Sequence, residues 1–360
     1  MRRIRQSELQ LHQPLPWSLY DAQGNLLLRQ GFVLSIPRHV DMLLHRGVYV
    51  HDEDSGMPAA TETSAATMVS SFHAEPAGAE PERHQRVPEA AGVAGRPDIH
   101  AYEIGGRLMQ ALRRLHLQVQ ADVTRARLAG QLAQLADMLL AGLDRDQDAL
   151  LAACHLERQA AYIDVQQVLG AVVAVRAARE AGMAETAQKS LACAALGRDL
   201  ALVPVQPQLD KWTGPLSDEL HQLIRRHPEE GARLVRTAGV QDGMWLDMML
   251  HHHERYDGSG YPHGLRGDQL HPACALLAVA DSYAAMVTSR ANREGRFPQE
   301  VLRELYLASG VLYSPAAVRL VIKTLTPYPP GTLVRLHGGE VGVFRNGVRS
   351  GERPGVWVLY

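Results

Sequence analysis

An apolar residue returns every three or four positions through most of residues 97–325, and this period constrains the fold more than any other feature. In the first part of the region the repeating residues are Ile104, Leu108, Leu112, Leu115, Leu128, Leu132, Leu135 and Leu139. This spacing places apolar side chains on one face of an α-helix. Proline and glycine clusters at 204–215, 257–272 and 290–298 divide the pattern into separate helices. The sequence therefore predicts a mainly α protein built as a helical bundle.

The two ends of the chain follow a different pattern. Residues 1–53 carry short alternating runs such as LPWSLYD and LLLRQGFVL on either side of a turn near Gly24, and residues 326–360 carry VRL, EVGVF and VWVLY. Such runs, separated by turn residues, predict small β-rich modules at the N- and C-termini. Residues 54–96 are rich in Ala, Ser, Thr, Glu, Pro and Gly, which is typical of a disordered linker. We expect the helical region to span residues 97–325.

Size and composition favour an intracellular protein of several domains. At 360 residues the chain is long for one domain, and 46% hydrophobic with 21% charged residues is ordinary for a soluble protein. The start, MRRIRQSELQLHQ, has no apolar stretch behind its basic residues, which argues against a secretory signal. Nothing reaches the roughly 18 uninterrupted apolar residues of a membrane-spanning helix. We therefore expect a cytoplasmic protein with no membrane partner.

Charge and cysteine content argue against two further classes of protein. The formal net charge of −2 provides no overall positive field, so we expect no nucleic-acid partner, and any anionic ligand must meet a local patch. The three cysteines, Cys154, Cys193 and Cys274, are widely spaced and form no CxxC pair. This spacing argues against a disulfide framework and against a zinc ribbon.

Residues 251–262, HHHERYDGSGYP, are the strongest candidates for chemistry. Histidines and carboxylates crowd the end of a predicted helix just before a glycine-rich loop. Imidazole and carboxylate are usual ligands of zinc, iron and manganese, and neighbouring histidines repel one another when protonated. The alternative is a solvated helix face that binds no ion, and the run alone does not decide between the two.

Three further polar residues, Asp199, His227 and Asp281, lie in separate predicted helices. Their spacing allows a bundle to bring them to the histidine run. Asp281 interrupts the apolar segment LLAVADSYAAM, where an unpaired carboxylate is costly, so it is either a metal ligand or a core residue with a polar partner. His227 precedes Pro228, and its simpler interpretation is a helix end.

The order of these segments resembles the HD-GYP family of metal-dependent cyclic-di-GMP phosphodiesterases. HHERYDGSGYPHGLRGDQL followed by ALLAVADSYAAM is similar to the family signature, in which HHE, DGxGYP and a later Ala-Asp helix occur in this order. PLSDELHQLIRRHPEEGARLV resembles the family segment with a ligand histidine before proline. The resemblance covers about residues 150–325, and the terminal β-rich modules look like those of some members. It implies an HD-superfamily helical bundle.

The resemblance also implies a cofactor, a substrate and a set of site residues. Two or three metal ions, usually iron or manganese, would activate a water for attack on cyclic-di-GMP, and paired ions would hold the attacking and leaving oxygens. Gly260, Tyr261 and Pro262 would shape the loop beside the substrate, and Asp199 would take part in catalysis. The implied metal ligands are Asp199, His227, His252, His253 and Asp281.

Arg290 and Arg293, in TSRANR, match two arginines of a family segment beside the ligand. A guanidinium suits a phosphate or a guanine edge. The alternative is a solvated loop. Ala291 and Asn292 depart from the proline and aromatic residue that the family has between them.

The match fails at the His-Asp pair from which the family takes its name. In ALGRDLALVPV, Arg198 stands where the histidine is expected, and Ala201 and Leu202 replace the glycine and lysine that follow. Upstream, in AYIDVQQV, Asp164 stands at the place of a further ligand histidine. The lost lysine removes a cation that would serve the phosphate.

Arg198 cannot coordinate a metal, because its guanidinium stays protonated and offers no lone pair. Two arrangements follow. Either Arg198 turns into the vacated metal space and pairs with Asp199 and Asp281, or it turns outward and a reduced site holds one ion. If Asp164 replaced the upstream ligand, the site could still support catalysis.

These departures predict a cyclic-di-GMP signalling protein with impaired catalysis, since one ion cannot hold both the attacking and the leaving oxygen. The alternative is a catalytically inactive cyclic-di-GMP receptor or protein-interaction scaffold, with signalling proteins as partners and no required cofactor. A third hypothesis, a domain that only dimerises through its helices, leaves the DGSGYP loop unexplained. Homodimerisation stays open.

Overall fold

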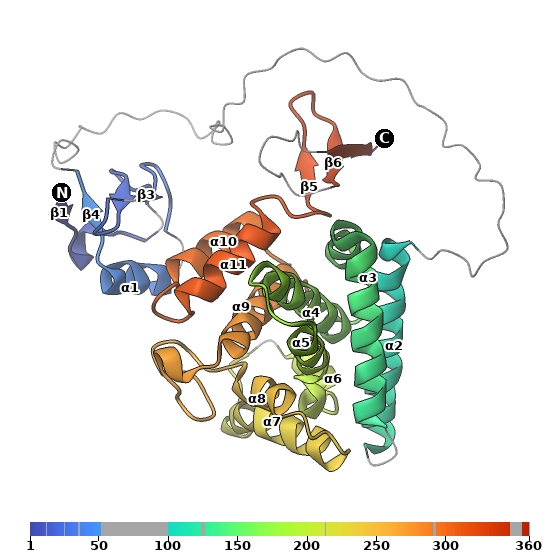
Figure 1. Ribbon diagram of the computed structural model, residues 1–360. Helices are drawn as coiled ribbons and strands as arrows, with labels where there is room; N and C mark the ends of the chain where they lie inside the picture. The colour runs from blue at the N-terminus through green and yellow to red at the C-terminus, as the bar shows by residue number, and fades with distance from the viewer. Residues whose placement is uncertain are drawn as a thin grey trace.

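The computed structural model combines a helical body with a small antiparallel sheet near each end of the chain (Figure 1). It describes residues 1–11, 13–24, 26–34, 37–51, 100–123, 127–212, 214–290, 293–345 and 355–359. The predicted linker, residues 54–96, lies outside the described residues. The predicted fold class, a mainly α bundle with β-rich ends, is confirmed.

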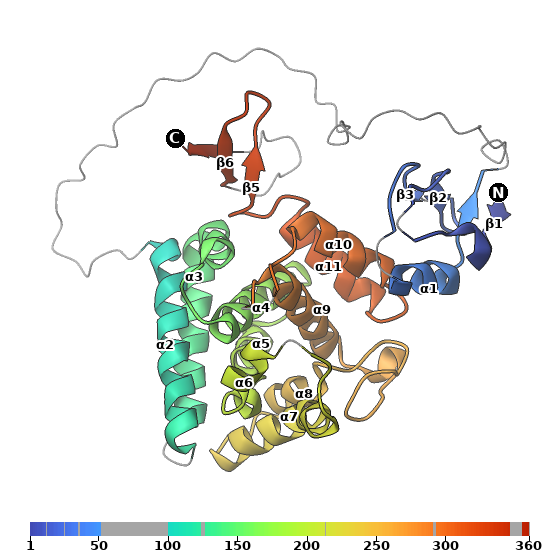
Figure 2. The same ribbon diagram turned by 180° about the vertical axis from the view of Figure 1, so that it is seen from behind.

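The helical body opens with a long hairpin and continues as shorter helices. α2 (Ala101–Asp122) and α3 (Leu128–Leu156) lie side by side in both views (Figures 1 and 2). The shorter helices are α4 (Tyr162–Glu180), α5 (Glu185–Gly197), α6 (Gln206–Lys211), α7 (Asp218–Thr237), α8 (Gly243–His251), α9 (Pro272–Val287), α10 (Pro298–Leu307) and α11 (Pro315–Leu325). Two 3₁₀ turns, η3 (Leu200–Leu202) and η4 (Gly267–Gln269), lie in the connections. Among the described residues, no helix has the length and apolarity needed to cross a membrane.

α4 is the central helix of this body. Every residue from Ile163 to Ala178 is buried, because α4 contacts α3, α5, α9 and α11. A helix covered on all sides should be apolar on all sides. α4 nevertheless buries four polar residues, and each needs a partner to offset its loss of water. These residues are Asp164, Gln166, Gln167 and Arg176.

α3 is broken at Asp146, which has a non-helical backbone (φ −158°, ψ 97°). The Asp146 carboxylate accepts the N–H groups of Asp148 at 3.0 Å and of Ala149 at 2.9 Å. These are the contacts of an N-cap, so a second helical segment begins here. That segment contains the buried Cys154 and the half-buried His155.

The N-terminal sheet has the strand order β1 (Arg2–Arg3), β4 (Tyr49–Val50), β2 (Leu19–Tyr20) and β3 (Leu26–Leu28), all antiparallel, with α1 (Pro37–Arg46) before β4. Its residues form a separate small core with leucines at 15, 19, 28, 34 and 43. Leu307 of α10 completes this core. The module therefore packs on the end of α10.

The C-terminal sheet has the order β5 (Leu333–Arg335), β6 (Val341–Phe344) and β7 (Val356–Leu359), also antiparallel. It follows a close approach of the chain to α3 at Gly331. A Cβ at this position would lie 2.8 Å from the Cβ of His155 and 2.9 Å from the backbone of Ala152. Gly331 also has a positive φ of 87°, so both contact and conformation require glycine here.

Candidate metal centre and its pocket

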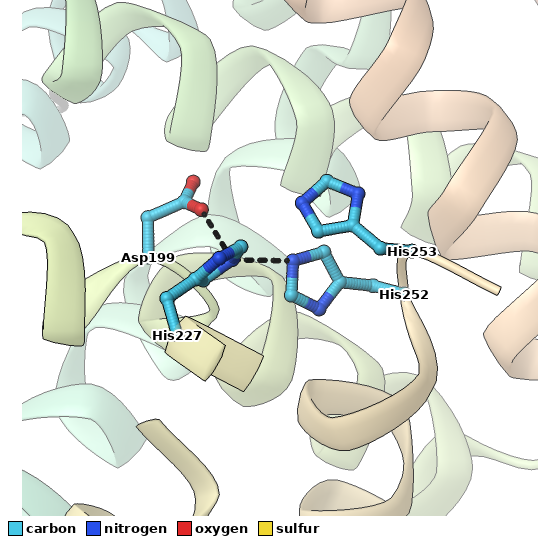
Figure 3. Close-up of side chains that lie close together, drawn as sticks. All are labelled: Asp199, His227, His252 and His253. Atoms are coloured by element: carbon cyan, nitrogen blue, oxygen red, sulfur yellow. Dashed lines mark hydrogen bonds and ion pairs between the residues drawn. The ribbon is translucent and has the colours of Figure 1, made fainter. Parts of the chain in front are cut away.

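Four side chains meet at the junction of α5, α7 and α8 (Figure 3). Asp199 follows the end of α5, and His227 lies in the middle of α7. His252 and His253 come directly after α8. One donor atom of each lies within 4.8 Å of the others. We call these four residues, Asp199, His227, His252 and His253, the buried centre.

Pro228 helps to orient His227. A proline has no N–H, so Pro228 cannot donate to the carbonyl of Ile224, four residues earlier in α7. The Nδ1 atom of His227 lies 2.5 Å from that carbonyl oxygen and can donate in its place. The ring is thereby turned so that its Nε2 atom faces the other members of the buried centre.

The end of α8 orients His252 in the same way. The last carbonyls of a helix lack intrahelical partners, and His252 Nδ1 lies 2.7 Å from the carbonyl oxygen of Met249. Its Nε2 atom then lies 3.2 Å from His227 Nε2, which is 3.4 Å from Asp199 Oδ1 (Figure 3). The ring of His253 lies beside that of His252, with centroids 4.2 Å apart.

This donor set fits a divalent metal ion. With both Nδ1 atoms donating to backbone carbonyls, the two facing Nε2 atoms present lone pairs that repel unless a proton or a cation lies between them. Ligands bound at about 2.1 Å to one ion are about 3.0–3.4 Å apart, which matches the separations between these nitrogen and oxygen atoms. His227 and His252 are each 1% exposed. The buried centre therefore has the composition and spacing of a metal site.

The pKa values favour the protonation states that metal ligands need. Burial, together with His227, lowers the pKa of His252 to about 4, and burial with both neighbouring histidines holds the pKa of His253 well below its usual range. Burial alone would raise the pKa of Asp199, but Arg198 and His227 outweigh it and hold that pKa far below its usual range. Near neutral pH, His252 and His253 are thus neutral and Asp199 is ionised.

The structure does not bring Asp281 into the buried centre. Its Oδ1 atom accepts hydrogen bonds from Arg198 Nε at 2.8 Å and from Gln166 Nε2 at 2.6 Å. Asp281 therefore has the polar partners that a buried carboxylate requires. Gln166, which the sequence interpretation missed, lies on α4 two residues after Asp164 and carries no motif signal of its own.

Arg198 turns inward, as the first of the two expected arrangements has it. Its side chain is fully buried, and Nε also lies 3.5 Å from Asp199 Oδ2. The guanidinium donates to the backbone carbonyls of Ala195 and Gln166 as well. A Cβ on Gly170 of α4 would lie 3.0 Å from Nη2, so the missing side chain at Gly170 makes room for the arginine.

Asp164 is engaged elsewhere and does not join the buried centre. Its carboxylate lies 2.6 Å from His116 Nδ1, and His116 Nε2 lies 3.1 Å from the side-chain oxygen of Gln167. All three side chains are buried between α2 and α4. His116 lies outside the region of family resemblance, so no motif pointed to a pair with Asp164.

A pocket of about 420 Å³, partly open to solvent, leads to the buried centre. Its lining includes Asp199, His227 and His253, and Asp281 beside them. Leu202, at the place of the family's lysine, also lines it. Three aromatic residues, Tyr162, Trp212 and Tyr261, also line the pocket.

Arg290 also lines this pocket, whereas Arg293 is not among the lining residues. The guanidinium of Arg290 lies 4.3 Å from the centre of the Tyr162 ring, and Nη2 donates to the Tyr162 hydroxyl at 2.6 Å. Arg293 instead donates to the backbone carbonyl of Ala285. Of the two arginines, only Arg290 is placed to meet a ligand in the pocket.

The loop with Gly260, Tyr261 and Pro262 is folded back onto the end of α8. A Cβ on Gly260 would lie 2.3 Å from the backbone nitrogen of Arg255, so no larger residue fits. The ring of Tyr261 lies 4.9 Å from that of His253, and burial raises the pKa of the Tyr261 hydroxyl. The close approach at Gly260 thus constrains the loop, and Tyr261 lines the pocket.

Part of the chain is similar to known proteins. Residues 152–316 match the HD domain family. The cyclic di-GMP phosphodiesterase PA4108 of Pseudomonas aeruginosa is 31% identical over 211 residues, which is 59% of this chain and 51% of the relative. A cyclic di-GMP phosphodiesterase of Thermotoga maritima is 33% identical over 149 residues, 41% of this chain and 40% of the relative. The chain thus spans about half or less of the length of these relatives.

A solved structure supports the fold. The HD-GYP-type protein Bd1817 from Bdellovibrio bacteriovorus superposes with a TM-score of 0.50 over 90% of this chain and 99% of its own, at 15% identity. At this identity the likeness concerns the fold alone. Together, the family match, the relatives and the fold confirm the resemblance to HD-GYP proteins predicted from the sequence.

Proposed function

We propose that the HD domain of this chain, which occupies residues 152–316 and resembles those of HD-GYP phosphodiesterases, binds cyclic-di-GMP in a signalling role and hydrolyses it slowly or not at all. The observation that carries the proposal is the position of Arg198. Its fully buried guanidinium lies between Asp281 and Asp199. It is a permanent cation where the family's chemistry would call for a metal ion.

The buried centre supports one divalent ion, iron or manganese, held by Asp199, His227, His252 and His253. Such an ion, when bound, neutralises phosphate charge and lowers the pKa of a coordinated water. Asp281 is the ligand that a second ion would need, and its carboxylate already receives Arg198 and Gln166. A second ion would also meet the positive charge of Arg198, so we expect at most one.

Side chains that line the pocket provide contacts for a cyclic dinucleotide. Tyr162, Trp212 and Tyr261 offer aromatic contacts for a guanine base, and Arg290, which already contacts Tyr162, offers its remaining N–H groups for a phosphate or a guanine edge. Leu202 offers no charge where a lysine would contact phosphate. The departures from the family pattern therefore affect the binding of cyclic-di-GMP less than its hydrolysis.

The second candidate function is a receptor or protein-interaction scaffold without any turnover. It is favoured by the same contrast: Arg198 is paired with Asp281 behind the pocket lining, while Arg290 and Tyr261 line the pocket. In this case cyclic-di-GMP, rather than its hydrolysis, carries the signal to a partner protein. We place the protein in the cytoplasm, where cyclic-di-GMP is made and read.

Binding and turnover are tested together on the full chain. Calorimetry with cyclic-di-GMP should show binding by the wild type and a clear loss of affinity in Arg290→Ala, with unchanged metal content. Arg319→Ala, which removes an exposed arginine of α11, is the matched control. Rapid hydrolysis by the wild type supplied with iron or manganese would contradict impaired catalysis. Absence of cyclic-di-GMP binding would contradict the whole proposal.

A further inference from the structure

A second group of metal-binding side chains lies outside the pocket, between the end of α8 and the loop after Pro262. His251, the last residue of α8, places its Nε2 atom 3.0 Å from Nδ1 of His263. The ring centroids are 5.2 Å apart and the planes are inclined by 59°. The two rings therefore meet through their nitrogens and not through stacked faces.

Asp247 fixes which nitrogen of His251 is available. Its Oδ1 atom lies 2.8 Å from His251 Nδ1, one helical turn away in α8. A proton on Nδ1 is thereby held toward the carboxylate, and Nε2 is left with its lone pair. A carboxylate that binds the far nitrogen of a histidine is the usual outer partner of a metal-binding imidazole.

Cys274 contacts Asp247 and is not itself a ligand. Its sulfur lies 3.3 Å from Asp247 Oδ2, and burial raises the pKa of the thiol. The thiol therefore keeps its proton and donates it to Asp247. Both carboxylate oxygens of Asp247 are then occupied, one by Cys274 and one by His251.

Glu254 provides a third donor. Its side chain is 1% exposed and accepts the backbone N–H groups of His263 at 2.7 Å, Gly264 at 3.1 Å and Leu265 at 3.1 Å. These bonds hold the loop against the carboxylate. One donor atom each of His251, Glu254 and His263 lie within 4.8 Å of one another. A carboxylate offers about four lone-pair directions, so one remains for a further contact.

We propose that His251 Nε2, His263 Nδ1 and a Glu254 oxygen form a second site for a divalent transition metal of the zinc class, with water completing the coordination. Two imidazoles and a carboxylate suit zinc, nickel or copper better than magnesium or calcium. His263 is exposed, so the ion can enter from solvent. The site shares no residue with the buried centre.

The bound ion would link the end of α8 to the loop that carries Tyr261. Without an ion, the two imidazoles make a simple hydrogen bond, in which Nδ1–H of His263 donates to His251. A metal site predicts that zinc binds at these residues. A hydrogen bond alone predicts that it does not.

The test is zinc titration of the full chain, stripped with a chelator and carrying no oligohistidine tag. We expect His263→Ala to bind one zinc ion fewer per chain than the wild type, and Asp247→Asn to bind that ion at least about tenfold more weakly. His337→Ala, which removes an exposed histidine from the C-terminal module, should bind as the wild type does. Thermal unfolding of each variant shows that it is folded.

Equal zinc stoichiometry and affinity in the wild type and His263→Ala would overturn the second site, as would a wild type that binds no zinc. Metal binding at the buried centre is measured separately, as the difference in metal ions per chain between the wild type and His252→Ala. Failure of one site therefore leaves the other measurable.

Discussion

Arg198 sets the charge balance beside the buried centre. Its guanidinium stabilises the carboxylates of Asp281 and Asp199 through contacts at 2.8 Å and 3.5 Å. A metal ion would do the same and would also bind and polarise a water, which a guanidinium cannot do. One side chain can thus keep the fold of the centre while weakening its chemistry.

Replacing Arg198 with histidine should therefore restore part of the chemistry. Arg198→His removes the cation, frees Asp281 and adds a ligand, so we expect one further metal ion per chain. Hydrolysis of cyclic-di-GMP should rise at least about tenfold, which corresponds to about 1.4 kcal/mol of barrier. Metal analysis and a turnover assay measure the two effects.

Arg198→Met is the matched control, because it removes the charge without adding a ligand. It leaves Asp281 buried without its cation, and breaking such a pair costs about 3–5 kcal/mol in unfolding free energy. We expect no gain of metal and a loss of stability in urea unfolding. Equal metal content in all three proteins would contradict the role assigned to Arg198.

The sequence predicted the residue types of the site better than their partners. His227, His252 and His253 were singled out by crowding and by motif, and the structure brings them together with Asp199. The direction of Arg198 could not be read from its own neighbours, because the space it fills is left by Gly170 in α4. Likewise, the partner of Asp164 is on α2, far away in the sequence.

At the scale of elements, the proline inside α7 is part of the site and not a helix end. Pro228→Ala would supply an N–H that competes with His227 Nδ1 for the Ile224 carbonyl. The His227 ring would lose its fixed orientation, so metal affinity at the buried centre should fall by about tenfold to a hundredfold. Calorimetric titration with manganese measures this change.

Pro298→Ala is the control for this experiment, because Pro298 begins α10, where no N–H is needed for a helical hydrogen bond. Its metal affinity should equal that of the wild type. Unchanged affinity in Pro228→Ala would show that the proline does not orient His227.

The loop after α8 depends on a close backbone approach at Gly260. Gly260→Ala would place a Cβ 2.3 Å from the nitrogen of Arg255, which is backbone and cannot move aside easily. We expect the loop with Tyr261 to shift and cyclic-di-GMP binding to be largely lost, while metal binding at the buried centre persists. Gly243→Ala, at the start of α8, would add a Cβ with no heavy atom within 4 Å, so it should bind cyclic-di-GMP as the wild type does. Full nucleotide binding by Gly260→Ala would argue against a role for this loop.

The helices were predictable because burial on one face imposes a regular period, as in α2 and the first part of α3. The fold-back of the loop was not predictable in the same way. It depends on three backbone N–H groups that meet the carboxylate of Glu254, and no side-chain pattern reveals those contacts. His263 consequently went unnoticed in the sequence.

At the scale of the whole molecule, both β-rich modules are attached to the helical body. The N-terminal module shares its core with Leu307 of α10. At the other end, His155 joins three parts of the chain. It lies on α3, with Nε2 2.9 Å from the Tyr283 hydroxyl of α9 and Nδ1 2.7 Å from the carbonyl oxygen of Pro330.

His155 should make stability depend on pH. Burial, aided by Arg176 and Arg158, lowers its pKa to about 4, whereas an unfolded histidine titrates near about 6.5. Because the unfolded chain binds the proton more readily, the stability that His155 contributes is present above about 6.5 and is lost as pH falls toward 4. In urea unfolding, His155→Gln should lose less stability than the wild type across this window.

His337→Gln, at an exposed histidine, should follow the wild-type pH dependence and serves as control. The other buried histidines are the same in all three proteins, so the difference between the curves isolates His155. If the unfolding free energies of the wild type and His155→Gln changed in parallel with pH, His155 would not be the source of this pH dependence.

The most direct test of the account is the number of iron or manganese ions held at the buried centre, measured as the ions lost per chain between the wild type and His252→Ala, with cyclic-di-GMP turnover assayed on the same samples. The proposal that Arg198 takes the place of a second ion predicts a loss of at most one ion and little or no turnover. A loss of two or more ions, accompanied by rapid turnover in the wild type, would contradict it.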